Sequence, residues 1–291
     1  MTGFLALAGC AGVWWVLRGV IGRREERRFE AAYRRGPDGI ILGAEPLLLT
    51  GRRPGAVLLL HGYNDSPQSV ASVAATIHAR GWTVRVPLLP GHGRSLPAFA
   101  RSGADAWLNE ARLELAVLRA THTEVAVGGL SMGGAIAFVL AAEQPAVRAV
   151  VAFAPYLHAP LPHRVVDALA AVAVLGARYV TSGGKRSIHD PLAGARIIAY
   201  RRSTPRLLAQ VDHMVRIAFE SLKRVKQPVL LVQSREDNRI PPHAAEEAYA
   251  QLGSQDKTLH WVEGSGHVLT MDYGHSVLEA LAADWLESRL Q

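Results

Sequence analysis

The sequence predicts a doubly wound α/β fold, in which helices cover both faces of a mostly parallel sheet. Short apolar runs at residues 56–60, 83–89 and 124–130 are typical of strands buried on both faces. Helically spaced apolar residues lie between these runs, at residues 66–80 and 104–121. This repeated alternation predicts parallel strands that are joined by right-handed crossovers.

The remaining elements of the predicted sheet follow the same alternation. Strands are expected at residues 40–50, 147–153, 228–233 and 258–262, and helices at residues 132–143 and 275–290. An insertion at residues 155–226 interrupts the pattern with two apolar helical stretches, residues 165–180 and 205–225. We therefore expect a helical cap over a core formed by residues 39–154 and 227–291.

Composition and charge exclude several classes of protein. With 49% hydrophobic and 20% charged residues, the 291-residue chain has an ordinary globular composition. The net charge is +7, but residues 18–35 alone hold seven arginines against three glutamates, beside an apolar N-terminus. This placement favours a membrane surface over a nucleic acid as the partner. The single cysteine, Cys10, excludes an intrachain disulfide and a cysteine-rich metal site.

An apolar segment at residues 1–22 precedes a basic linker at residues 23–38. Its uncharged run, residues 4–17, is intermediate in length between a signal peptide's apolar region and a full membrane span. Residues 3–21 are long enough to cross a thin bilayer if Arg18 extends to the headgroups. We expect an uncleaved anchor, and the arginines that follow it place the next domain in the cytoplasm by the positive-inside rule.

Three other interpretations of the N-terminal segment stay open. Residues 7–10 read Leu-Ala-Gly-Cys and match the lipobox of a lipoprotein signal in their letters. A cleaved signal peptide of a secreted protein is least favoured, because no Lys or Arg precedes the apolar run. The segment could also be an apolar helix that packs on the domain.

Residues 129–133 form a G-x-S-x-G element, Gly-Leu-Ser-Met-Gly, where an expected strand meets an expected helix. Such an elbow exposes a serine hydroxyl on a strained turn. Gly129 and Gly133 are needed there because side chains would clash within the tight turn. Ser131 is therefore the candidate nucleophile, and the alternative is a glycine-rich turn without catalysis.

A serine is a weak nucleophile unless a base removes its proton. His267 ends the sequence Gly-Ser-Gly-His directly after the strand expected at residues 258–262. His260 lies inside that strand, His243 begins a helix and His92 precedes the serine. We therefore predict His267 as the base, although surface and capping roles are common for a single histidine.

The imidazole needs an acid that fixes its tautomer and stabilises its positive charge. Asp237 follows the strand expected at residues 228–233 and is the predicted acid. Glu236 is the second choice, whereas Asp256 and Asp272 lie away from the expected strand end.

The oxyanion of an acyl-transfer reaction needs two backbone N–H donors aimed at it. Met132, which directly follows the serine, is predicted to supply one of them. The other is predicted to come from Tyr63, in the His-Gly-Tyr loop that follows the strand at residues 56–60.

From about Val57 to the C-terminus, the chain resembles bacterial carboxylesterases and monoacylglycerol lipases of the α/β-hydrolase superfamily. The order of serine, aspartate and histidine is that of the superfamily. The resemblance is carried by the motifs HGYNDSP (61–67), PLLPGHGRS (87–95), GGLSMGG (128–134), VQSREDNRIPP (232–242) and EGSGHVLTMD (263–272).

This resemblance implies an α/β-hydrolase fold with a helical cap and an acyl-enzyme formed on Ser131. The implied substrates are small-molecule or lipid esters with an apolar acyl chain, and neither a metal nor an organic cofactor is implied. Thioesterase or amidase activity would use the same residues. Haloalkane dehalogenases and epoxide hydrolases are disfavoured, because they need an aspartate in place of Ser131. A non-enzymatic binding protein is the remaining alternative.

Overall fold

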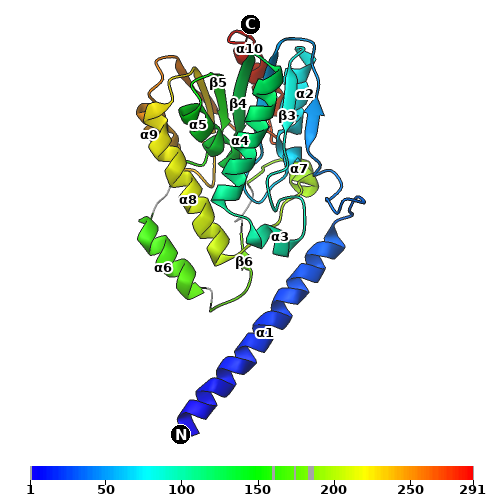
Figure 1. Ribbon diagram of the computed structural model, residues 1–291, viewed down its shortest axis with the longest axis vertical. Coiled ribbons are helices and arrows are strands. Elements are labelled where there is room, and N and C mark those ends of the chain that lie inside the picture. Colours follow the sequence, from blue (N-terminus) through cyan, green and yellow to red (C-terminus); the bar gives the residue numbers. More distant parts are fainter. Residues whose placement is uncertain (1, 159–160, 174, 183–186, 291) are drawn as a thin grey trace.

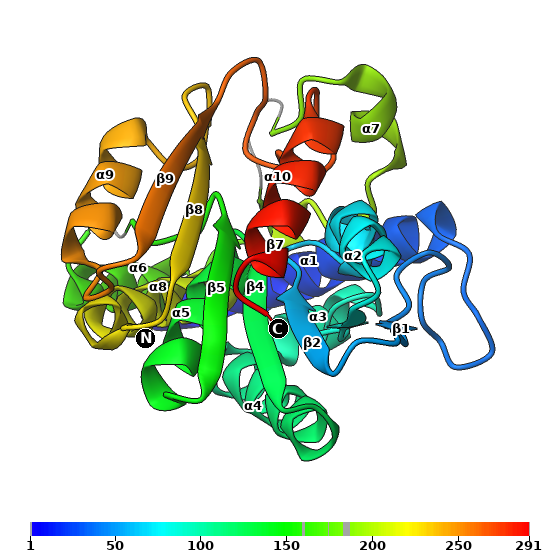
Figure 2. The ribbon, with the colours of Figure 1, turned by 90° about the horizontal axis from the view of Figure 1, so that it is seen from above.

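A seven-stranded sheet forms the centre of the molecule. The computed structural model describes residues 2–158, 161–173, 175–182 and 187–290. The strand order is β1-β3-β2-β4-β5-β8-β9, and every neighbouring pair is parallel except β1 with β3 (Figure 2). The predicted doubly wound, mostly parallel sheet is thereby confirmed. The strands are β1 (Leu47–Leu49), β2 (Gly55–Leu60), β3 (Thr83–Val86), β4 (Glu124–Leu130), β5 (Val147–Phe153), β8 (Val229–Ser234) and β9 (Lys257–Val262).

Helices cover both faces of this sheet (Figures 1 and 2). The core helices are α2 (Ala71–Ala79), α3 (Leu96–Arg101), α4 (Ala104–Thr121), α5 (Met132–Glu143), α9 (Pro242–Gln251) and α10 (His275–Glu287), with a 3₁₀ helix at Pro67–Val70. Along β2, Leu58 and Leu60 join the apolar cluster of α4 and α5, while Val57 and Leu59 join that of α2 and α10. Both faces are buried because successive side chains point to opposite sides of a strand, which explains the uninterrupted apolar run in the sequence.

Between β5 and β8 the chain forms a cap over the carboxyl ends of the strands (Figure 1). Its elements are α6 (His163–Ala173), β6 (Val180–Thr181), α7 (Pro191–Arg196), β7 (Arg202–Ser203) and α8 (Pro205–Ser221), with a 3₁₀ helix at Leu222–Arg224. β6 and β7 pair as a two-stranded antiparallel sheet, with α7 between them in the chain. This pair of strands is called the cap hairpin below. Residues 159–160, 174 and 183–186 of the predicted cap lie outside the described residues.

Several predicted elements are shorter in the structure. The helix expected at residues 165–180 ends at Ala173, and the chain beyond Gly176 enters β6 through residues of higher strand propensity, including Tyr179. The strand expected at residues 83–89 ends at Val86, because Pro87 has no N–H to donate to a neighbouring strand.

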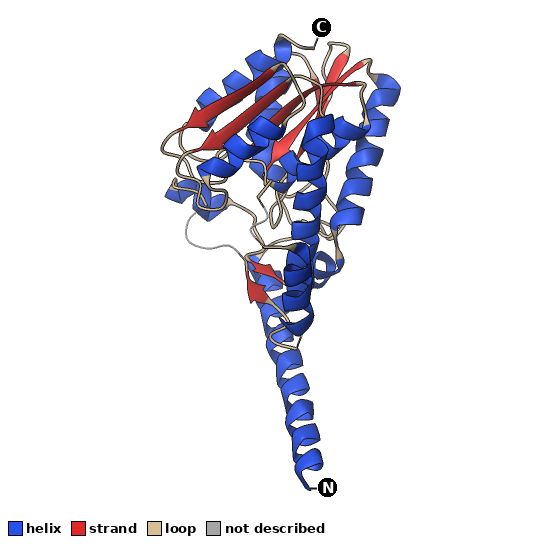
Figure 3. Ribbon diagram, turned by 90° about the vertical axis from the view of Figure 1, so that its left-hand side faces the viewer, coloured by secondary structure: helices blue, strands red, loops and turns tan. Residues whose placement is uncertain are grey.

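A single helix, α1 (Thr2–Ala32), spans both the predicted apolar segment and most of the predicted basic linker. Residues 23–32 continue the helix because Arg, Glu and Ala are strong helix formers. Pro37, five residues beyond the end, is incompatible with a helix interior. The N-terminal end of α1 extends away from the body of the molecule (Figures 1 and 3), whereas Trp14 and Arg18 donate hydrogen bonds to the Leu175 and Gly176 carbonyl oxygens of the cap.

In the described part of the chain, no helix combines the length and the apolar character that crossing a membrane requires. Membrane attachment and a cytoplasmic location stay predictions.

Candidate active site

Ser131 lies on a sharp turn between β4 and α5. Its backbone has φ 54° and ψ −116°, a conformation that costs a non-glycine residue about 1–3 kcal/mol. The turn is packed so tightly that a Cβ at Gly133 would stand 2.1 Å from the Leu60 carbonyl oxygen, and one at Gly129 would stand 2.5 Å from it. Both positions therefore need glycine, as the sequence motif predicts. The strained turn lifts the Ser131 side chain out of the sheet.

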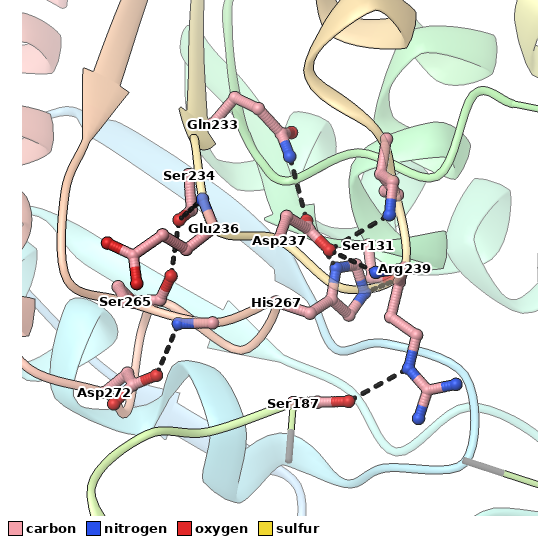
Figure 4. A network of polar contacts seen from close by, with 12 residues as sticks. Ser131, Ser187, Gln233, Ser234, Glu236, Asp237, Arg239, Ser265, His267 and Asp272 are labelled. Atoms are coloured by element: carbon pink, nitrogen blue, oxygen red, sulfur yellow. Dashed lines mark hydrogen bonds and ion pairs between the residues drawn. The ribbon is translucent and has the colours of Figure 1, made fainter. Parts of the chain in front are cut away.

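The structure brings Ser131, His267 and Asp237 together at the carboxyl ends of β4, β9 and β8 (Figure 4). His267 Nε2 is 2.8 Å from Ser131 Oγ, and His267 Nδ1 is 2.8 Å from Asp237 Oδ2. When the Nδ1–H is donated to the carboxylate, Nε2 is left as the acceptor for the serine hydroxyl proton. This is the geometry that nucleophile activation requires.

The Asp237 carboxylate is held by donors on both of its oxygens (Figure 4). Oδ1 accepts the backbone N–H groups of Arg239 at 2.7 Å and Ile240 at 3.0 Å. Oδ2 accepts the Gln233 side-chain amide at 2.8 Å in addition to His267. Burial alone would raise the pKa of Asp237, but the hydrogen bond and charge of His267, with the two backbone donors, hold the pKa below its usual value. Asp237 is therefore ionised at neutral pH.

The other carboxylates considered for the acid role lie elsewhere. Glu236 is half exposed and accepts the Gly264 backbone N–H at 2.7 Å. Asp256 forms an ion pair with Arg289 at 3.0 Å. Neither contacts the His267 imidazole, although Glu236 is the direct neighbour of Asp237 in the sequence.

Asp272 holds the loop that carries His267 in place, a role that the sequence did not suggest. Its fully buried carboxylate accepts four backbone N–H groups, from Gly266 at 2.6 Å and from His189, Asp190 and Tyr273 at 2.8 Å. Burial opposes ionisation, but these four donors hold the pKa of Asp272 below its usual value. Asp272 thus joins the loop carrying His267 to the cap segment before α7.

Gln233 lies within the motif at 232–242, but an amide at the end of an apolar strand does not by itself indicate a role in the site. Its side chain is completely buried, and its only described hydrogen bond is the one to Asp237. The Gln233 amide therefore orients the Asp237 carboxylate.

The loop after β2 lies directly against Ser131. A Cβ at Gly62 would stand 3.4 Å from Ser131 Cβ. Buried His61 fixes the loop, because its Nε2 accepts the Leu89 N–H at 3.1 Å and its Nδ1 donates to the Gly62 carbonyl at 2.9 Å. Burial lowers the pKa of His61 to about 4, so the ring is neutral. Tyr63, the next residue of this loop, lines the same cavity as Ser131.

Met132 is the first residue of α5, so its N–H lies in the first helical turn and has no helical carbonyl to bind. The positive end of the helix dipole adds to the attraction for a negative oxygen at this point. The two predicted oxyanion donors, Tyr63 and Met132, thus directly follow Gly62 and Ser131, two residues that lie against each other.

A cavity of about 1080 Å³ opens over Ser131 and His267. On one wall, α8 presents Leu208, Val211 and Val215, whose spacing of three and four residues places them on one face of the helix. The lining also includes polar residues such as Asp65, where burial raises the carboxyl pKa to about 7 despite hydrogen bonds from Ser69 and Ser66. Among the described residues, no three His, Cys, Asp or Glu side chains gather as a metal site would require.

Comparisons with known proteins agree with this architecture. The family described as serine aminopeptidase, S33, matches residues 51–273. Thermostable monoacylglycerol lipase from Bacillus sp. (strain H-257) is 28% identical over 242 residues, which cover 82% of this chain and 92% of that protein.

Solved structures show the same fold. A structure from work on LipS and LipT, two metagenome-derived lipolytic enzymes, has a TM-score of 0.79 and 30% identity, and the match covers 86% of this chain and 99% of that one. The crystal structure of Paleococcus ferrophilus monoacylglycerol lipase has a TM-score of 0.73 at 23% identity, covering 84% of this chain and 98% of that one. These likenesses confirm the predicted α/β-hydrolase fold.

Proposed function

Because this chain belongs to the S33 serine aminopeptidase family of α/β-hydrolases, we propose that its site hydrolyses carboxylic esters through an acyl-enzyme on Ser131. The observation that carries the proposal is the 2.8 Å contact of His267 with Ser131 and with Asp237 at the floor of a large cavity. The similar proteins include a monoacylglycerol lipase and lipolytic enzymes, which supports esters as the substrates.

In the first half-reaction, Ser131 Oγ attacks the ester carbonyl carbon while His267 Nε2 takes the hydroxyl proton. The carbonyl oxygen becomes an oxyanion, which the N–H groups of Tyr63 and Met132 stabilise. The tetrahedral intermediate then expels the alcohol oxygen, which leaves with the proton from His267. Asp237 holds the imidazole and stabilises its positive charge throughout.

In the second half-reaction, water takes the place of the alcohol. His267 removes one proton from the water as its oxygen attacks the acyl-enzyme carbonyl, and returns that proton to Ser131 Oγ as the acid leaves. The same two N–H groups stabilise the second oxyanion. The enzyme is thus restored, and the ester has become a carboxylic acid and an alcohol.

The cavity supports an apolar acyl group as the part of the substrate that lies along α8. Burial of each methylene against Leu208, Val211 and Val215 contributes about 0.8 kcal/mol of binding. Among p-nitrophenyl esters and glycerol monoesters, we therefore expect kcat/KM to rise as the acyl chain lengthens until the wall is filled.

Matched esters, thioesters and amides test the reaction type. We expect the ester of a given acyl group to be turned over at least about 10-fold faster than its amide, because an alcohol is a better leaving group than an amine. Amino-acid anilides belong in the panel because the family description names an aminopeptidase. If the thioester or the anilide were turned over faster than the matched ester, the function would be that of a thioesterase or an amidase.

We also propose that the N-terminal half of α1 attaches the enzyme to a lipid surface. Trp15, Val16 and Leu17 are each at least 49% exposed, and arginines follow them. Aromatic and apolar side chains beside a basic stretch suit the headgroup region of an anionic membrane. The full chain is expected to sediment with vesicles that contain phosphatidylglycerol, and Trp15→Ser with Val16→Ser to do so less. Equal sedimentation of both proteins would exclude this attachment.

A further inference from the structure

The C-terminal half of α1 lies against the cap hairpin β6–β7. Glu25 Oε2 accepts a hydrogen bond from Arg202 Nε of β7 at 2.9 Å. Glu26 Oε1 accepts the Tyr179 hydroxyl proton at 2.7 Å and pairs with Arg178 at 3.1 Å, just before β6 begins. Two consecutive carboxylates of α1 thus hold β7 and the two residues that lead into β6.

Apolar contacts continue the same helix face. The Phe29 ring stacks on the Tyr200 ring, with centroids 4.8 Å apart and planes 7° from parallel. One turn later, the Tyr33 hydroxyl donates to the Ala199 carbonyl at 3.1 Å. Phe29 and Tyr200 are both less than 9% exposed. This burial makes the contact stronger than exposed ion pairs alone, which contribute about 0–1 kcal/mol each.

The hairpin in turn contacts the loop after β2. Ser203, the neighbour of Arg202 on β7, is 1% exposed, and its hydroxyl oxygen is hydrogen-bonded to the Tyr63 hydroxyl. The Tyr63 ring also packs on Phe99, with centroids 5.2 Å apart. A direct series of contacts therefore runs from Glu25 through Arg202 and Ser203 to Tyr63.

Tyr63 is the residue whose backbone N–H would stabilise the oxyanion. Such a donor is effective only when it is held in place before the charge develops, and removal of one donor in other enzymes costs about 100- to 1,000-fold in kcat. A small displacement of Tyr63 is therefore enough to slow the chemical step.

We propose that α1 is a positioning element of the active site: by holding hairpin β6–β7, it fixes Tyr63 and with it one of the two oxyanion donors. This inference rests on the proposed function. Glu25, Glu26 and Ser203 act through Tyr63 and do not contact the substrate's reacting atoms. A helix that served only as a tether would leave the chemical step unchanged when its contacts with the hairpin are removed.

The test uses the full chain with Tyr63→Phe, Ser203→Ala and the double variant Glu25→Gln/Glu26→Gln. Glu30→Gln is the matched control, because Glu30 lies on α1 but pairs with Arg35 at 2.7 Å and does not contact the hairpin. Ser203→Thr keeps the hydroxyl and serves as the conservative rescue. Each protein is assayed on a short-chain, water-soluble ester, so that binding to a lipid surface does not enter the rate.

The inhibition constant of an alkylboronic acid is the second measurement. It separates a displaced oxyanion donor from a general loss of folded protein. The Ser131 oxygen adds to boron while the serine proton passes to His267, and the resulting tetrahedral boronate places an oxygen where the oxyanion forms. Its inhibition constant therefore measures binding of the transition-state geometry. Active-site titration with a fluorophosphonate corrects every rate for the folded fraction.

We expect kcat to fall about 10-fold for Tyr63→Phe and Ser203→Ala and about 3- to 10-fold for the glutamate double variant, with KM changed less than about twofold. The boronate inhibition constant should rise by the same factor as kcat/KM falls. Glu30→Gln and Ser203→Thr should stay within about twofold of the wild type.

Wild-type values of kcat and of the inhibition constant in the glutamate double variant would overturn the inference, as would a lower rate with an unchanged inhibition constant. Failure of the proposed function is a different result, in which the wild type itself neither hydrolyses the ester nor reacts with the fluorophosphonate. An active wild type with unaffected hairpin variants would reject only the positioning role of α1.

Discussion

Replacing Ser131 by alanine is expected to lower kcat by about 10⁶-fold on any ester that the wild type hydrolyses. The variant loses the atom that forms the acyl-enzyme, and only the oxyanion donors and substrate binding remain to speed direct attack by water. Steady-state rates on a p-nitrophenyl ester and the intact mass after exposure to a fluorophosphonate measure the effect. The wild type should gain one adduct by forming a Ser131 Oγ–phosphorus bond with loss of fluoride, and the variant should gain none.

Ser187→Ala is the matched control for this substitution. Ser187 lines the same cavity, but its hydroxyl accepts a hydrogen bond from Arg239 and does not contact His267. Its kcat should stay within about 10-fold of the wild type, because its hydrogen bond with the Arg239 guanidinium involves none of the reacting atoms. If the Ser131→Ala variant kept the adduct or more than about 1% of the rate, the nucleophile would be another residue.

Replacing Asp237 by asparagine is expected to lower kcat by about 10⁴-fold with little change in the fold. An asparagine side chain can turn its NH₂ group toward His267 and thereby favour the tautomer with Nδ1 unprotonated, which leaves Nε2 as a donor that cannot accept the serine proton. It also removes the negative charge that stabilises the imidazolium. The kcat of the variant and its melting temperature, measured together, separate this effect from unfolding.

Glu236→Gln provides the comparison, since it removes the adjacent carboxylate and leaves the Asp237 contacts with His267 and Gln233 in place. We expect less than about a threefold change in kcat, because Glu236 is half exposed and binds only at the surface of the loop. A larger loss for Glu236→Gln than for Asp237→Asn would reverse the assignment of the acid.

Local sequence was sufficient to place the elements that bring the reacting groups together. The apolar run of β2 and the apolar run that leads into Ser131 predict parallel strands buried on both faces, because no polar side chain can be accommodated there. Parallel strands end at one edge of a sheet, so residues that follow β4, β8 and β9 are expected to meet. The G-x-S-x-G element adds the strained turn, since its glycines are needed by the close backbone.

For other parts of the site, the sequence left an alternative open or gave no indication. Asp237 and Glu236 are consecutive carboxylates after the same strand, and only the course of the turn decides which one faces His267. Gln233 acts through a buried side-chain contact with Asp237, and Asp272 acts by accepting four backbone N–H groups. Their importance depends on burial and on nearby donors, which the sequence does not display.

The N-terminal segment shows most clearly which features the sequence determines and which depend on the tertiary structure. By itself the sequence determined an apolar stretch followed by arginines and glutamates, along with the strand pattern, the serine turn and the order of serine, aspartate and histidine. Only the tertiary structure decided that Glu25, Glu26 and Phe29 face a hairpin more than 150 residues later in the chain. The physical reason is that buried strands and tight turns are specified by neighbouring residues, whereas ion pairs and ring contacts between distant segments exist only after the chain has folded.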